Sequence, residues 1–145
     1  MIEELGRRGE GRREAGAFLL APRKGERRRV SRIVYLDDLD PHCLVGSIHL
    51  NGDAYSALWS LCDRDQLRVI ADIHTHPGKG VRQSAIDMDN PMVARRGHLA
   101  LIAPDLATRP ISPRELGVHE YLAEDGWSSR FGRKARRLVY VGRHP

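Results

Sequence analysis

Two short stretches decide the fold: residues 67–77, Leu-Arg-Val-Ile-Ala-Asp-Ile-His-Thr-His-Pro, and residues 84–87, Ser-Ala-Ile-Asp. Apolar residues alternate along the first part and predict a strand that runs into the two histidines. Because alternate residues of a strand point to the same face, His74 and His76 are expected to present two imidazoles side by side. Pro77 cannot donate to a ladder and is expected to end the strand. A short helix beginning near Ser84 would then bring Asp87 against both rings.

These residue types at this spacing are typical of a metal site. Two histidine nitrogens and one carboxylate oxygen leave the fourth position of a tetrahedral zinc open to water, as in catalytic rather than structural sites. A zinc hydrolase also needs a carboxylate that is not a ligand, to take the proton from the water. Glu14, at the head of an apolar segment, is the candidate. Two simpler interpretations stay open: Ser84 and Asp87 also fit a helix capping box, and the histidines could be ordinary strand residues.

Together these segments resemble the JAMM metalloproteases, the catalytically competent branch of the JAB/MPN domains. The family pattern is a Glu ahead of a strand, then His-Ser/Thr-His-Pro, then Ser-x-x-Asp. This chain matches it with Glu14, residues 74–77 and residues 84–87, and the spacing between the last two agrees without a gap. The resemblance spans residues 14–125. Many members have Cys after the glutamate, where this chain has Ala15, but the general base does not need that Cys.

The resemblance implies a site and a mechanism. His74, His76 and Asp87 would hold Zn²⁺, Glu14 would act as the general base, and Ser84 would donate a hydrogen bond to the oxyanion. Water in the open zinc position would attack the amide without a covalent enzyme intermediate. The expected reaction is cleavage after the C-terminal glycine of a ubiquitin-like protein, for deconjugation or precursor processing in a bacterial conjugation or antiviral pathway.

Other functions are considered beside this one. A related peptidase could process a sulfur-carrier protein conjugate, and a non-catalytic MPN-like scaffold is the alternative outside enzymes, although the complete ligand set argues against it. Nucleic-acid binding through the arginine-rich start and the basic tail is not expected. A net charge of +5 speaks only to non-specific attraction, and no basic platform with interleaved aromatic residues is present.

Length and composition indicate a single domain over residues 1–145, with a flexible lead-in over 1–13 and a basic tail over 130–145. No apolar run reaches the length of a membrane span, and the first residues lack the apolar region of a signal peptide. We therefore expect a cytoplasmic protein with no membrane partner. Cys43 and Cys62 lie in apolar contexts outside any CxxC motif and are expected to be buried free thiols.

The periodicity predicts an α+β domain with a mixed, mainly antiparallel sheet, one long helix and one or two short ones; the resemblance adds the curled, helix-covered sheet of the JAB/MPN fold. The long helix is expected over residues 54–65, where apolar side chains recur at helical spacing. Strands are expected at 16–21, 27–36, 44–50, 67–76, 98–103 and 116–123, with a further edge strand considered at 138–141. Asp72 is expected at the surface rather than as the partner of an imidazole, and His49 is expected to be exposed or hydrogen-bonded.

Overall fold

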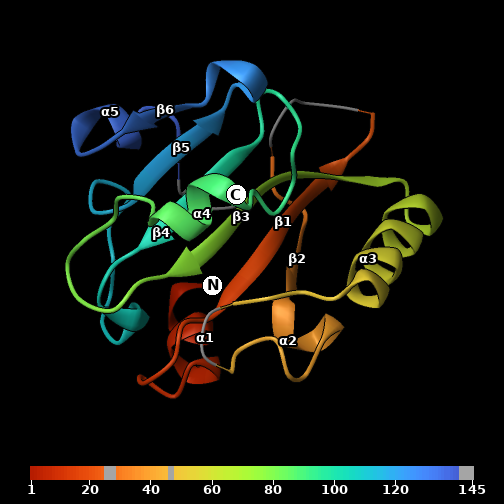
Figure 1. Ribbon diagram of the computed structural model, residues 1–145, viewed down its shortest axis with the longest axis horizontal. Helices are drawn as coiled ribbons and strands as arrows, with labels where there is room; N and C mark the ends of the chain where they lie inside the picture. Colours follow the sequence, from red (N-terminus) through yellow and green to blue (C-terminus); the bar gives the residue numbers. More distant parts are fainter. Residues whose placement is uncertain (25–28, 46–47, 141–145) are drawn as a thin grey trace, which may run out of the picture.

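The computed structural model describes residues 1–24, 29–45 and 48–140, which form a mixed α/β fold with one sheet and several helices (Figure 1). The strands are β1 (Gly16–Pro22), β2 (Arg32–Tyr35), β3 (Leu67–Thr75), β4 (Leu99–Ala103), β5 (Gly117–Tyr121) and β6 (Trp127–Arg130). The helices are α1 (Ile2–Arg8), α2 (Leu36–Leu39), α3 (Gly52–Arg64), α4 (Ala85–Asp89) and α5 (Arg133–Arg136), with 3₁₀ turns at Asp105–Ala107 and Ala123–Asp125. The expected α+β class is confirmed. Across the described residues, no helix has both the length and the apolarity to cross a membrane.

The strand order in the sheet is β2-β1-β3-β4-β5-β6. Among the described strands, β3 and β4 make the one parallel pair, and the other neighbours are antiparallel. A parallel pair cannot be joined by a tight turn and requires a crossover connection. Here the crossover carries α4, which lies in front of β3 and β4 in the view of Figure 1. The connection that the topology demands is therefore also the segment that follows the two histidines.

The central strand β3 is buried from Val69 to Thr75 because both faces of the sheet are covered. Asp72 and His74 point to the same face of the sheet. Phe18 of β1 pairs with Asp72 of β3, so its side chain lies on that face as well. Phe18 contacts the ring of Tyr55 on α3, with 6.3 Å between ring centroids. Helix α3 therefore packs on the face of the sheet that bears His74.

Helix α3 confirms the long helix expected from the sequence. It begins after Asn51, whose side chain accepts a hydrogen bond from the Ala54 amide at 2.9 Å. Leu58 and Cys62 are buried beneath it, and their helical spacing is the pattern from which the helix was predicted. Cys43 and Cys62 are buried free thiols, as expected.

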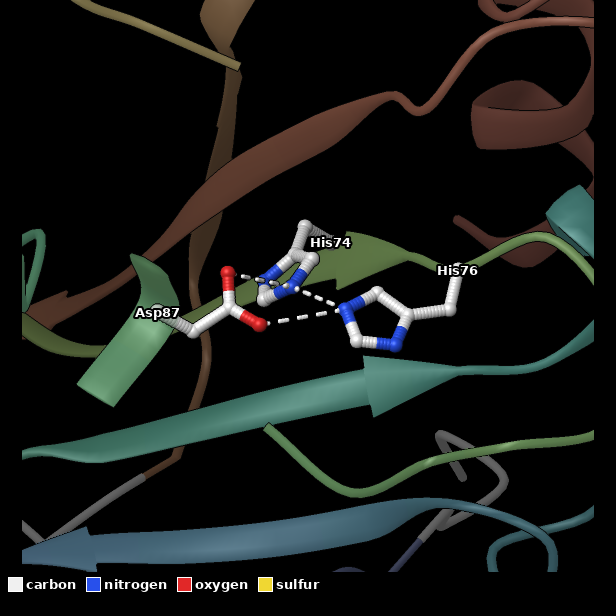
Figure 2. A group of neighbouring side chains, drawn as sticks. All are labelled: His74, His76 and Asp87. Carbon is white, nitrogen blue, oxygen red and sulfur yellow. Dashed lines mark hydrogen bonds and ion pairs between the residues drawn. The ribbon is translucent and has the colours of Figure 1, made fainter. Parts of the chain in front are cut away.

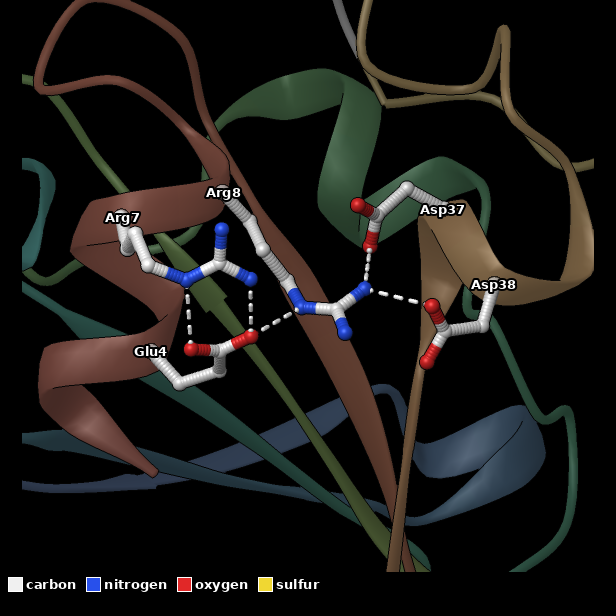
Figure 3. Close-up of polar contacts among 5 residues, drawn as sticks. All are labelled: Glu4, Arg7, Arg8, Asp37 and Asp38. Atoms are coloured by element: carbon white, nitrogen blue, oxygen red, sulfur yellow. Dashed lines mark hydrogen bonds and ion pairs between the residues drawn. The ribbon is translucent and has the colours of Figure 1, made fainter.

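The expectation of a flexible lead-in over residues 1–13 is wrong for its first part. Residues Ile2–Arg8 form α1, and Leu5 is completely buried. The Arg8 guanidinium, shown in Figure 3, donates to Glu4 and to both Asp37 and Asp38 of α2, each at 2.7 Å. Its partners in α2 lie 29 and 30 residues away. These contacts fix a helix that local sequence alone would leave loose.

Three further expectations differ from the structure. The return strand expected over residues 27–36 is confined to β2, and its residues 27–28 lie outside the described residues. No strand forms at residues 44–45 or 48–50, and none at 138–140, with 46–47 and 141 outside the described part of the chain. Conversely, β6 forms at Trp127–Arg130, where no strand was expected. A strand needs a partner, and pairing with β5 makes Trp-Ser-Ser-Arg a strand despite its polar sequence.

Candidate metal centre

The structure brings together the two histidines of β3 and the aspartate of α4 (Figure 2). The Nε2 atoms of His74 and His76 are 3.0 Å apart. The Asp87 carboxylate lies 3.6 Å from His74 Nε2 through Oδ1 and 3.2 Å from His76 Nε2 through Oδ2. In Figure 2 both rings and the carboxylate point at the same small volume. Such a group could hold a metal ion.

The two histidines are fixed by the end of β3. His74 is buried and pairs with Gly16 on β1 and Ile102 on β4. A Cβ at Gly16 would lie 2.9 Å from the Ile73 carbonyl oxygen and 2.6 Å from Leu36, so glycine is required for this close packing. His76 follows the last strand residue, and its backbone amide still donates to the Ala103 carbonyl at 2.9 Å. Both rings therefore come from backbone held within the sheet.

Asp87 is oriented by the start of α4. Ser84 is the N-cap, and its hydroxyl accepts from the Asp87 amide at 3.2 Å. The Asp87 carboxylate in turn accepts from the Ser84 amide at 2.7 Å. The capping box considered as a simpler interpretation is thus present, and it coexists with the approach to the histidines. The cap sets the direction in which the carboxylate points.

The electrostatics of the group favour an ionised carboxylate beside imidazole. The hydrogen bond to Asp87 raises the pKa of His76, against the opposing effect of burial. For Asp87, burial alone would raise the pKa, but hydrogen bonds from His74 and His76 hold it far below its usual range. Asp87 is therefore negatively charged at any physiological pH, as a metal ligand must be.

The donor spacing fits a tetrahedral ion. Ligand atoms about 2.0–2.2 Å from a tetrahedral zinc are separated by about 3.3–3.6 Å. The observed distances of 3.0, 3.2 and 3.6 Å are close to that range, with the two carboxylate distances measured to different oxygens of Asp87. His74 differs from the usual metal-binding histidine in one respect. Its Nδ1 is buried and has no hydrogen-bond partner among the described residues, so packing within the sheet orients this ring.

Glu14 and Ser84, the two residues expected to act without binding metal, line the same cavity as the three donors. The cavity has a volume of about 1160 Å³, and its lining also includes Trp127 and Phe131. Glu14 is half-buried, and its charge contributes to the raised pKa of His76. All five residues proposed from the sequence thus lie around one space.

The expectation that Asp72 lies at the surface is wrong. It is 2 % exposed rather than at the surface, and its carboxylate accepts from His98 Nε2 at 2.6 Å. It is an imidazole partner, but of His98, which immediately precedes β4, rather than of His74. The pairing could not be read from the sequence because 26 residues separate the two. His49 is exposed and lines the cavity without joining the donor group.

No family model matches this chain. Its fold is similar to the solution structure of a protein from Desulfitobacterium hafniense, with 21 % sequence identity, a TM-score of 0.56, and coverage of 89 % of this chain and 84 % of that one. It is also similar to the solution structure of a protein from Salinibacter ruber, with 15 % identity, a TM-score of 0.56, and coverage of 99 % and 90 %. At this level of identity the likeness concerns the fold alone.

Proposed function

We propose that this protein is a zinc-dependent peptidase or isopeptidase of the JAMM type, which cuts the bond after the C-terminal glycine of a ubiquitin-like protein. The observation that carries the proposal is the convergence of His74, His76 and Asp87 beside a cavity whose wall includes Glu14. These residues also occur in the order and spacing of the JAMM pattern.

The imidazoles of His74 and His76 and the carboxylate of Asp87 would hold Zn²⁺. When bound, zinc supplies a Lewis acid that lowers the pKa of water toward about 7 and polarises a carbonyl group. Three protein donors would leave the ion accessible to water or substrate, as in catalytic rather than structural zinc sites. The open cavity in front of the donors gives a substrate access to that position.

Glu14 would take the proton from the attacking water as the new C–O bond forms, and would return it to the amine as the amide C–N bond then breaks. The register of β1 and β3 supports this role. Gly16 pairs with His74, and continuing the same register places Glu14 across from His76. Glu14 is not one of the three donors, so its carboxylate remains available as a base.

Ser84 would donate a hydrogen bond to the carbonyl oxygen of the substrate as negative charge develops there. Its hydroxyl already accepts from the Asp87 amide, but a hydroxyl group can accept and donate at the same time. The capping bond therefore leaves the Ser84 hydrogen free to face the cavity. One residue can then serve both as the helix cap and as the oxyanion donor.

The proposed substrate class follows from how a substrate can reach the three ligands. The donors lie at the end of a central strand, so the bond to be cut must approach the sheet closely, which a flexible C-terminal tail can do. Backbone held this near a metal favours small residues, and glycine next to the cut bond is expected. Main-chain hydrogen bonds to an extended tail then supply affinity with little demand on side chains.

The test is cleavage of a ubiquitin-like protein fused through its terminal glycine to a short extension, with the products measured by mass spectrometry. We expect release of the protein ending in glycine by the zinc-loaded chain and not by Glu14→Gln. Replacing that glycine with a bulky residue should slow cleavage far more than changing the leaving group. Intact fusions alongside cleavage of unstructured peptides at non-glycine sites would instead indicate a general peptidase.

A further inference from the structure

Asp87, the third proposed metal ligand, lies on the short helix α4, which is not stable without contacts to the rest of the protein. His74 and His76 belong to a central strand, but Asp87 is carried by α4, which has five residues and no buried side chain. An isolated helix of this length is not stable in water. The position of Asp87 relative to the histidines must therefore come from contacts made by the arm that carries it, residues 78–90.

The β5–β6 hairpin makes two such contacts. His119 of β5 donates from Nε2 to the carbonyl oxygen of Val81 at 2.9 Å. Trp127 of β6 donates from Nε1 to the carbonyl oxygen of Met88 at 3.1 Å. The first anchor precedes Asp87 and the second immediately follows it along the chain. The two hydrogen bonds therefore secure the arm on both sides of the donor.

The two hydrogen bonds of His119 fix which of its ring nitrogens carries the hydrogen. A carbonyl oxygen can only accept, so Nε2 carries the hydrogen, and Nδ1 accepts from the Ser129 hydroxyl at 2.8 Å. The ring is 1 % exposed and meets the edge of Phe131, with 5.6 Å between centroids. Burial lowers the pKa of His119, which keeps the ring in the neutral form that makes both bonds.

Gly117, two residues before His119, shows how closely residues 78–90 pack against the β5–β6 hairpin. A Cβ at Gly117 would lie 2.0 Å from the Val81 carbonyl oxygen, so any side chain at this position would push Val81 away. Gly117 pairs with Ile102 on β4, and Ile102 in turn pairs with His74. The hairpin thus connects the Asp87 arm to the strand that bears the histidines.

We infer that His119 and Trp127 are positioning residues that hold Asp87 in place as a metal ligand, so that the β5–β6 hairpin sets the metal affinity of the site. The inference rests on the proposed metal site. Groups that orient metal ligands contribute about 10–100-fold to metal affinity. The hairpin therefore acts on the metal through the arm and without contacting it.

The experiment measures the zinc dissociation constant of the full chain by competition with a chromogenic chelator, with no substrate present. His119→Leu removes the donor and should weaken zinc binding about 10–100-fold. His119→Gln restores an N–H group and should recover part of this loss. Gly117→Ala keeps the His119 side chain but would place a Cβ 2.0 Å from the Val81 carbonyl oxygen and 2.8 Å from His119 Nε2, so it should disrupt the same hydrogen bond and also weaken binding. Trp127→Phe, which removes only the indole N–H, should have a smaller effect. Trp59→Phe, on the exposed side of α3, is the matched control and should bind like the wild type.

The decisive comparison repeats His119→Leu in an Asp87→Ala background. If His119 acts through Asp87, its effect on zinc affinity should disappear there, whereas general damage to the sheet would persist. Persistence of the full effect, or wild-type affinity in both His119→Leu and Gly117→Ala, would overturn the inference. If His119→Leu does not fold, Gly117→Ala and Trp127→Phe are compared in the same two backgrounds. A wild-type chain that binds no zinc would overturn the proposed function as well, so the two failures are distinguishable.

Discussion

Thr75 and Ala15, both buried, exchange two hydrogen bonds beside the residues of the candidate site. The Ala15 amide donates to Thr75 Oγ1 at 2.9 Å, and the Thr75 amide donates to the Ala15 carbonyl at 2.9 Å. Thr75 lies between the two histidines in sequence, with its side chain on the opposite face of the strand, and Ala15 follows Glu14. The residue between the metal donors therefore fixes the backbone that carries the proposed general base.

The first prediction concerns this link. Thr75→Val keeps the shape of the side chain but leaves the buried Ala15 amide without its acceptor. We expect displacement of Glu14 to lower kcat by about 10²-fold, since small misplacements of catalytic groups have effects of this size. Zinc content should not change, and Thr75→Ser should keep most of the activity. Steady-state kinetics on the glycine-linked fusion, with elemental analysis of each variant, measures both quantities.

A second prediction separates the two roles of Ser84. Replacing an N-cap serine with alanine costs about 0.5–2 kcal/mol of stability, whereas glycine costs only a few tenths. Loss of one oxyanion donor costs about 10²–10³ in rate. Ser84→Ala and Ser84→Gly should therefore lose similar activity although they differ in stability. Near-normal turnover by Ser84→Gly would show that the hydroxyl serves only as a cap.

The pH dependence of zinc binding follows from the shifted pKa values. Because the pKa of His76 is raised, the metal-free site holds a proton to higher pH than a free imidazole would, and zinc must displace that proton. Zinc affinity should therefore fall as the pH is lowered through the pKa of His76. Asp87 stays ionised throughout this range and should not add to the effect. Calorimetry in buffers of different ionisation enthalpy should detect proton release on binding, and its absence would contradict this protonation scheme.

Arg8 provides a test of fold stability away from the site. Its guanidinium bonds to three carboxylates and lies over the ring of Tyr35 at 4.1 Å from the centroid, joining α1 to β2 and α2. Arg8→Ala should lower the free energy of unfolding by about 1–3 kcal/mol, as for hydrogen bonds to charged groups. Arg7, which is exposed and bonds to Glu4 on the same helix (Figure 3), is the matched control. Arg7→Ala should change stability little, and equal losses in both variants would refute the special role of Arg8.

The parts of the fold with a strong local signal could be predicted from the sequence. The β3 strand follows from apolar alternation, and α3 from its apolar stripe and Asn51 cap. By contrast, β6 is polar and becomes a strand only by pairing with β5. Segment 44–50 has strand-like composition, yet its described residues bury Leu44 and Leu50 without any strand pairing. Helix α1 is stabilised by partners remote in sequence.

The candidate site shows the same division. His74 and His76 share a face because they are two residues apart on a strand, and Asp87 could be placed by the Ser84 helix start. What holds the Asp87 arm could not be predicted, because His119 and Trp127 lie 38 and 39 residues from their acceptors. The burial of Asp72 was missed for the same reason, since its partner His98 lies 26 residues away, just before β4.

The central claim, a zinc centre built by His74, His76 and Asp87, is tested most directly by elemental analysis of the purified chain. We predict one zinc per chain in the wild type and in Glu14→Gln, and loss of most of the zinc in His74→Ala and in Asp87→Ala. Glu14→Gln is the matched control, because it changes a carboxylate on the cavity wall that is not a donor. A wild-type chain without zinc, or full zinc occupancy in a His74→Ala/His76→Ala double variant, would contradict the account.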